Sequence, residues 1–105
     1  MTTLTSPVDL LSAVPFMIGF TPQDSLVVMG LRNEAVDVAM RLDFPENLDL
    51  DQISTIVGHL RSNNIEEALL VSYIPESVTD ADVVIKALSE ALESGGFPLR
   101  ESLIV

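Results

Sequence analysis

Hydrophobic residues along this chain form two kinds of strand-like pattern. Residues 26–31 and 68–74 are largely continuous apolar runs of strand length, which are typical of strands covered on both faces. Residues 36–43 instead alternate apolar and polar side chains, which predicts a half-exposed strand that pairs with residues 26–31 as a hairpin. A last strand is expected near residues 101–105. The first two runs are therefore expected in the centre of a sheet, with residues 36–43 toward an edge.

Helix signals lie between and before these strands. Ser6 and Pro7 suit the cap and the first position of a helix that Pro15 bends or ends. Asp49 can cap a second helix, and Gln52 can complete a capping box with it. The inner face of this second helix is expected to hold Ile53, Ile56, Val57 and Leu60.

A third helix is expected in the C-terminal half of the chain. Either Ser77 or Thr79 can cap it, and the glycine pair at residues 95–96 is a stop signal. Its inward-facing positions are expected to be Val83, Val84, Ala87, Leu88, Ala91 and Leu92, which recur at helical spacing.

These elements predict an α/β fold. Their order along the chain is α-β-β-α-β-α-β, which gives a mixed sheet of about four strands with helices packed on the sheet. The two strand-helix-strand units favour parallel pairings, and the hairpin adds an antiparallel one. The length of 105 residues fits one domain, so residues 1–105 are expected to form a single α/β domain.

Charge narrows the classes of partner. Five basic residues against sixteen acidic residues give a net charge of −11, which repels nucleic acid and anionic membrane surfaces. The chain has no cysteine, which suits a reducing compartment, and its N-terminus lacks a secretory signal, so a cytoplasmic location is expected. The sequence ends on the apolar residues 103–105, from which we expect an N-terminal part of a longer protein.

One segment resembles a known family. Residues 10–20 read LLSAVPFMIGF, and Pro22 and the run DSLVVMGL at residues 24–31 follow. In order and spacing these residues resemble the N-terminal signature of a bacterial domain-of-unknown-function family, number 4192, found in actinobacterial proteins. The resemblance implies a fold and a cellular setting. It carries over no activity and no catalytic or binding residue, so it leaves the role open. We expect no catalytic residue, no cofactor and no metal.

Two acidic and polar clusters are candidate ligand sites. Asp43, Glu46, Asp49 and Asp51 carry oxygens of the kind that hard cations bind, but the spacing lacks the EF-hand pattern and capping accounts for Asp49. We therefore expect no metal site. Because ligands of open α/β sheets bind beyond the carboxyl ends of the strands, Asp43, Ser72 and Tyr73 are the candidate ligand-binding residues. His59, the only histidine, is expected at the solvent edge of its helix.

Two hypotheses for function stay open. The first is a non-catalytic interaction or assembly domain that binds a protein partner or itself, through the strand edge at residues 103–105 and an apolar surface. The residues of that surface would be Phe16, Met17, Ile18 and Phe20. The alternative is a small-ligand or enzyme domain whose site lies at the carboxyl strand ends and is completed by residues beyond Val105.

Overall fold

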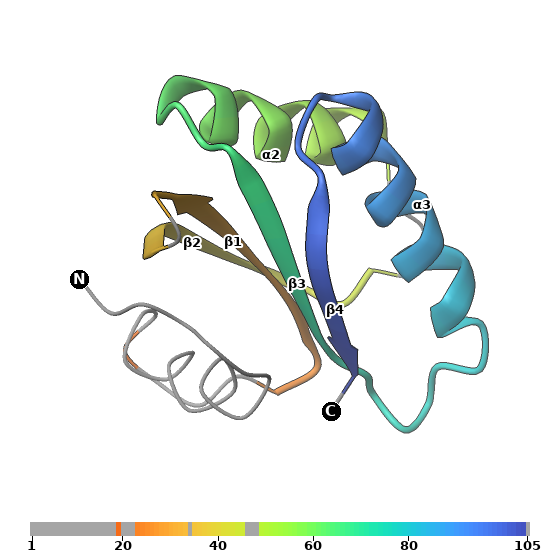
Figure 1. The fold of residues 1–105 in the computed structure, drawn as a ribbon. Coiled ribbons are helices and arrows are strands. Elements are labelled where there is room, and N and C mark those ends of the chain that lie inside the picture. Colours follow the sequence, from red (N-terminus) through yellow and green to blue (C-terminus); the bar gives the residue numbers. More distant parts are fainter. Residues whose placement is uncertain (1–18, 20–22, 34, 46–48, 105) are drawn as a thin grey trace.

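The computed structural model describes residues 19, 23–33, 35–45 and 49–104 (Figure 1). Its elements are β1 (Ser25–Arg32), β2 (Ala35–Asp43), α2 (Leu50–Ser62), β3 (Glu67–Tyr73), α3 (Ala81–Ser94) and β4 (Leu99–Ile104). The predicted helix after Ser6 lies outside the described residues, and so do the predicted interaction residues Phe16, Met17, Ile18 and Phe20. Neither described helix is long and apolar enough to cross a membrane.

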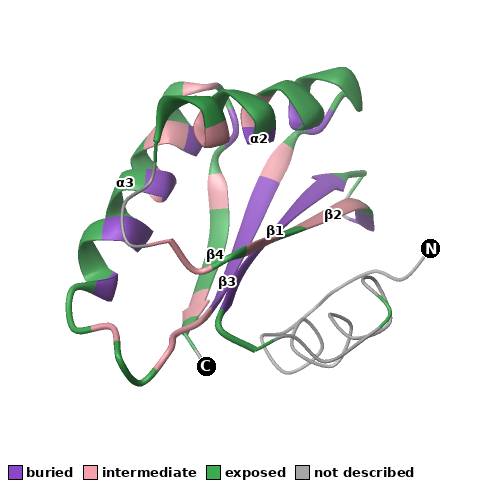
Figure 2. Ribbon diagram, turned by 180° about the vertical axis from the view of Figure 1, so that it is seen from behind, coloured by how far each residue is buried: buried purple, intermediate pink, exposed green. Residues whose placement is uncertain are grey.

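The four strands form one mixed sheet in the order β2-β1-β3-β4. β1 is antiparallel to both β2 and β3, and β3 is parallel to β4. Helices α2 and α3 lie on the same side of this sheet (Figures 1 and 2). The α/β class, the central places of β1 and β3 and the edge position of β2 are therefore confirmed.

One predicted pairing is wrong. Two adjacent parallel pairs were expected, but the sheet has a single one, between β3 and β4. β2 and β3 do run in the same direction, yet β1 lies between them and is antiparallel to each. β1, the hairpin partner of β2, lies directly beside β3. The connection that runs from β2 through α2 to β3 therefore has to cross over β1.

Alternation along the strands gives the sheet two apolar faces. On the helix side, Leu26 and Val28 of β1 and Leu70 of β3 pack with Leu60 of α2 and Leu88 of α3. On the other side, a second buried cluster consists of Val27, Met29, Leu31, Val36, Leu69 and Val71. Figure 2 shows that the buried strand residues concentrate on β1 and β3. The prediction that the first apolar run is covered on both faces is confirmed.

The start of α2 is as predicted. Asp49 accepts a hydrogen bond from the Gln52 main-chain N–H at 2.8 Å, and the Gln52 side chain accepts one from the Asp49 N–H at 3.2 Å. This reciprocal pair is a capping box, which satisfies two donors that the first turn leaves without a helical partner. Ile56 and Leu60 are buried on its inner face, and the helix ends at the C-cap Asn63.

Two details of α3 differ from the prediction. Its N-cap is Asp80, without a side-chain capping bond, in place of Ser77 or Thr79. The buried stripe consists of Ala81, Val84, Ile85, Leu88 and Leu92. Val83 is instead 68% exposed and Ala87 is also exposed. The predicted stripe was rotated by a fraction of a turn, because adjacent valines at 83 and 84 do not show by pattern alone which one faces the sheet. The predicted stop is confirmed, with Gly95 as C-cap and Gly96 at φ 97°.

Candidate binding groove between β2 and α2

A groove lies between the edge strand β2 and helix α2. Its cavity volume is about 410 Å³. β2 contributes Met40, Arg41 and Leu42, and the cap and helix contribute Asp49, Asp51, Gln52, Thr55, Ile56 and His59. This is the size range of small-molecule sites, but the groove has one strand and one helix as walls. The described part of the sheet ends at β2, so the groove runs along a sheet edge.

The floor of the groove is apolar because β2 alternates. Met40 and Leu42 lie opposite Val28 and Leu26 in the sheet register, so all four side chains point to the helix side. Met40 and Leu42 are only partly buried, because they belong to the edge strand. Ile56 of α2 is 5% exposed and completes this apolar floor.

The helix wall of the groove follows from helical periodicity. Gln52, Thr55 and His59 are spaced three and four residues apart and therefore share one side of α2. The hydroxyl of Thr55 donates a hydrogen bond to the Asp51 carbonyl at 2.9 Å. Thr55 and His59 are exposed and Gln52 is partly exposed. The wall is therefore polar and accessible above an apolar floor.

Negative charge lies at one end of the groove. The carboxylates of Asp49 and Asp51 lie at the N-terminal end of α2, where the helix dipole favours negative charge. His59 lies two turns further along the same helix. The guanidinium of Arg41 bonds to the Asp43 carboxylate at 2.9 Å, an ion pair between residues on the same side of β2. Asp43 is thus engaged by a neighbouring cation of its own strand.

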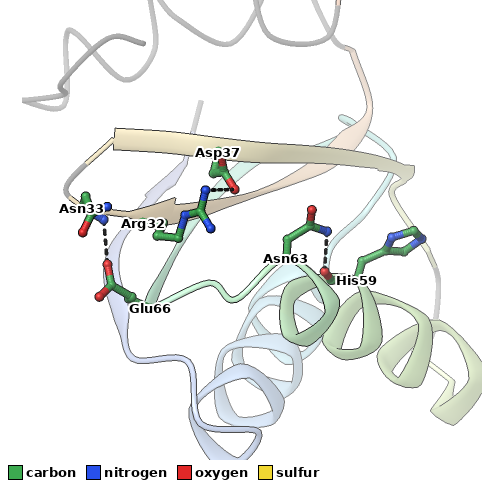
Figure 3. A network of polar contacts seen from close by, with 6 residues as sticks. All are labelled: Arg32, Asn33, Asp37, His59, Asn63 and Glu66. Carbon is green, nitrogen blue, oxygen red and sulfur yellow. Dashed lines mark hydrogen bonds and ion pairs between the residues drawn. The ribbon is translucent and has the colours of Figure 1, made fainter.

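Contacts at the far end of α2 hold the helix against the hairpin (Figure 3). The Asn33 N–H in the β1–β2 turn donates to Glu66 Oε1 at 2.6 Å, and the Glu66 N–H donates to the Leu31 carbonyl at 2.9 Å. Asn63 Nδ2 donates to the His59 carbonyl at 2.8 Å, and Figure 3 shows the His59 imidazole extending from α2 away from this contact. The loop after α2 therefore fixes the helix relative to the hairpin that supplies the groove floor.

The three predicted ligand-binding residues lie at one end of the sheet, on two different faces. Asp43 and Tyr73 both pair with Ser25 in the register, so they flank it on the side away from the helices. Ser72 points to the helix side, is fully buried, and its hydroxyl has no hydrogen-bond partner among the described residues. Burial raises the pKa of the Tyr73 phenol above its ordinary value of 10.0. The geometry thus places Asp43 and Tyr73 on one face of the sheet, with Ser25 between them, and Ser72 on the other face.

No metal centre is formed by the part of the chain that the structure describes. In residues 19, 23–33, 35–45 and 49–104, no group of three or more His, Cys, Asp or Glu side chains could hold an ion. Of the four acids considered as cation ligands, Asp43 pairs with Arg41 and Asp49 caps α2. Glu46 lies outside the described residues.

Sequence reasoning missed the groove. The sequence places Met40 and Leu42 on one face of a half-exposed strand, Gln52 in a cap and His59 at a solvent edge, and each of these predictions is confirmed by itself. A signal was present in the pattern. The residues of α2 that face an edge strand with apolar positions are polar at 52, 55 and 59, so the two elements do not close over one another.

The family model described as Domain of unknown function (DUF4192) matches residues 7–105 of the chain. The search of curated proteins finds no match.

Proposed function

The chain belongs to the DUF4192 family of unknown function, and from this premise we propose that it is a non-catalytic interaction domain that binds a protein partner in the groove between β2 and α2. The observation that carries the proposal is the combination of an apolar floor with polar walls at a sheet edge. Enclosed pockets suit metabolites, whereas a groove that is open along one side suits a longer occupant.

The polar groups of the groove support a binding role because several of them already form hydrogen bonds within α2 and its cap. The Asp49 carboxylate caps α2, and Gln52 returns the bond. The Thr55 hydroxyl is engaged with the Asp51 carbonyl. Groups held in this way shape and solvate a surface, whereas catalysis needs a nucleophile or base held by an orienting partner. Partly buried Met40 and Leu42 supply apolar area that a partner can cover.

The test uses a peptide library displayed on phage, selected against the purified chain. The variant Thr55→Arg places a long cation in the groove, and Ser54→Arg places the same charge on the neighbouring exposed position of α2, which does not line the groove. We expect selected peptides to bind the wild type and Ser54→Arg alike and to lose about tenfold or more in affinity for Thr55→Arg. If selection yields no peptide, or only peptides that bind both variants equally, the proposed function is refuted.

A second candidate, self-association through β4, is favoured by one observation. Ile104 is 59% exposed, although it lies opposite the fully buried Ser72 in the parallel register. The described sheet ends at β4, and an edge strand with an exposed apolar residue is a template for further pairing. Sedimentation of the wild type and of Ile104→Lys at increasing concentration tests this candidate. Association that the lysine abolishes supports it, and a wild type that stays monomeric contradicts it.

A further inference from the structure

The hydrogen bonds between β2 and β1 show which main-chain groups of β2 turn away from β1. The Phe44 N–H donates to the Asp24 carbonyl at 2.9 Å, directly after the register pair Ser25 and Asp43. Main-chain groups of alternate residues in a strand point the same way, so those of Met40 and Leu42 also turn toward β1. The main-chain groups of Ala39 and Asp43 therefore turn toward the outer side of β2.

The side chains of β2 show where the side chains of an added strand would lie. At the same strand, Met40 and Leu42 direct their side chains to the helix side and form the groove floor. A peptide that lies beside β2 as a further strand can bond to the main chain of Ala39 and Asp43. Every second side chain of that peptide then points to the helix side, between the floor and the wall made by Gln52, Thr55 and His59.

The charge of the chain indicates the charge of the occupant. Asp49 and Asp51 stand at one end of the groove, and the whole chain has a net charge of −11. A cationic occupant is attracted by this field, and an acidic one is repelled. Nucleic acid and anionic membranes are repelled for the same reason. A second copy of this chain would bring a further eleven negative charges, which disfavours it as the occupant.

We propose that the groove takes an extended peptide segment of a partner protein, with apolar residues alternating with lysine or arginine, as an added strand on β2. The apolar side chains fill the groove over Met40, Leu42 and Ile56, while the basic side chains point to the opposite face of the added strand and are attracted by the negative charge of the chain, to which Asp51 contributes. This inference rests on the proposed function and adds the conformation and the chemistry of the partner.

The test uses synthetic peptides of about eight residues, enough for one strand. One alternates leucine with lysine, a second alternates leucine with glutamate, and a third carries N-methyl groups on the leucine–lysine main chain, which remove its donors. Each is titrated by fluorescence anisotropy into the full chain, as wild type, Thr55→Arg, Ser54→Arg and Asp51→Asn. The two arginine variants carry the same charge, so they separate blockage of the groove from general repulsion of a cation.

We expect the leucine–lysine peptide to bind about tenfold or more tightly than the other two peptides. Thr55→Arg is expected to weaken this binding by about tenfold relative to Ser54→Arg, and Asp51→Asn by roughly threefold, with the latter difference shrinking in high salt. Equal binding of the leucine–glutamate peptide or of the N-methylated peptide overturns the inference. So does a dimer of the wild-type chain that Thr55→Arg abolishes and that no peptide displaces.

The two proposals fail in different ways. If the phage selection recovers groove-dependent peptides that are acidic or helical, the proposed interaction function stands and the extended basic partner is wrong. If no peptide of any kind depends on the groove, the interaction function itself fails.

Discussion

Gly30 offers the sharpest test of how tightly the hairpin packs under the helices. It lies in β1 at the start of a register shift, opposite Val38 of β2. A Cβ atom at this position would lie 2.7 Å from Ile65 Cγ1, 2.8 Å from Ile65 Cδ1 and 2.8 Å from Val38 Cγ1. Carbon atoms in contact normally lie about 3.5–4.0 Å apart, so Gly30→Ala has to displace both neighbours.

The magnitude follows from two opposing effects. Overpacking of a well-packed core costs about 1–3 kcal/mol, and Ile65 is a buried core residue. Replacing glycine by alanine lowers the entropy of the unfolded chain, and this raises the free energy of unfolding by roughly 0.4–1 kcal/mol. We therefore expect Gly30→Ala to lower the free energy of unfolding by about 1–2 kcal/mol. At roughly 4 °C for each kcal/mol, Tm falls by about 4–8 °C.

The assay is urea unfolding followed by circular dichroism, with Gly58→Ala as the matched control. A Cβ at Gly58 meets nothing within 4 Å, and this glycine lies inside α2, so the same substitution is expected to stabilise by about 0.5–1 kcal/mol. Adding Ile65→Ala opens the space that the new Cβ needs. The cost of Gly30→Ala should therefore shrink in that background. A Gly30→Ala chain as stable as the wild type, or a cost unchanged by Ile65→Ala, refutes the packing described here.

Three further predictions concern stability. Asp49→Ala removes the capping bond to the Gln52 N–H and is expected to cost about 0.5–2 kcal/mol in urea unfolding, whereas Gln52→Ala, which removes only the longer return bond, should cost less. Leu60→Ala empties a fully buried site and should cost about 2.7–5 kcal/mol, while Leu50→Ala, at a side chain 80% exposed, should change stability by no more than about 0.5 kcal/mol. Burial raises the pKa of Tyr73 in the folded chain above 10.0, so the stability held by the neutral phenol is complete below that pH and is lost as pH rises through the folded pKa. Tyr73→Phe should remove this part of the alkaline loss, which unfolding curves across that range will measure; Tyr73 is the only tyrosine, so its tyrosinate absorbance can be followed directly.

The strands and the start of α2 could be predicted because local chemistry decides them. A continuous apolar run marks a strand buried on both faces, and Asp49 with Gln52 makes a cap from four consecutive residues. The neighbour of β3 could not be predicted in the same way. Local sequence shows that β2 and β3 run in the same direction, but the place of β1 between them depends on which long-range pairing is more stable.

The polar positions 52, 55 and 59 of α2 were a signal of the groove, but its place and width could not be predicted, for a related reason. Its floor and its wall come from residues that each have an ordinary local role, such as Met40 on an alternating strand and Gln52 in a cap. A cavity exists where two elements fail to close, and the distance between β2 and α2 is set by contacts elsewhere, including the bond from the Asn33 N–H to Glu66. Such distances are not written in the pattern of either element.

The most direct test of the central claim is amide hydrogen exchange of the isotope-labelled chain, measured by NMR with and without the leucine–lysine peptide. The peptide is expected to slow exchange at the Ala39 and Asp43 amides and to shift the resonances of Gln52, Thr55 and His59. Exchange that is unchanged at both amides, or shifts confined to β4 and the sheet end near Tyr73, would contradict it.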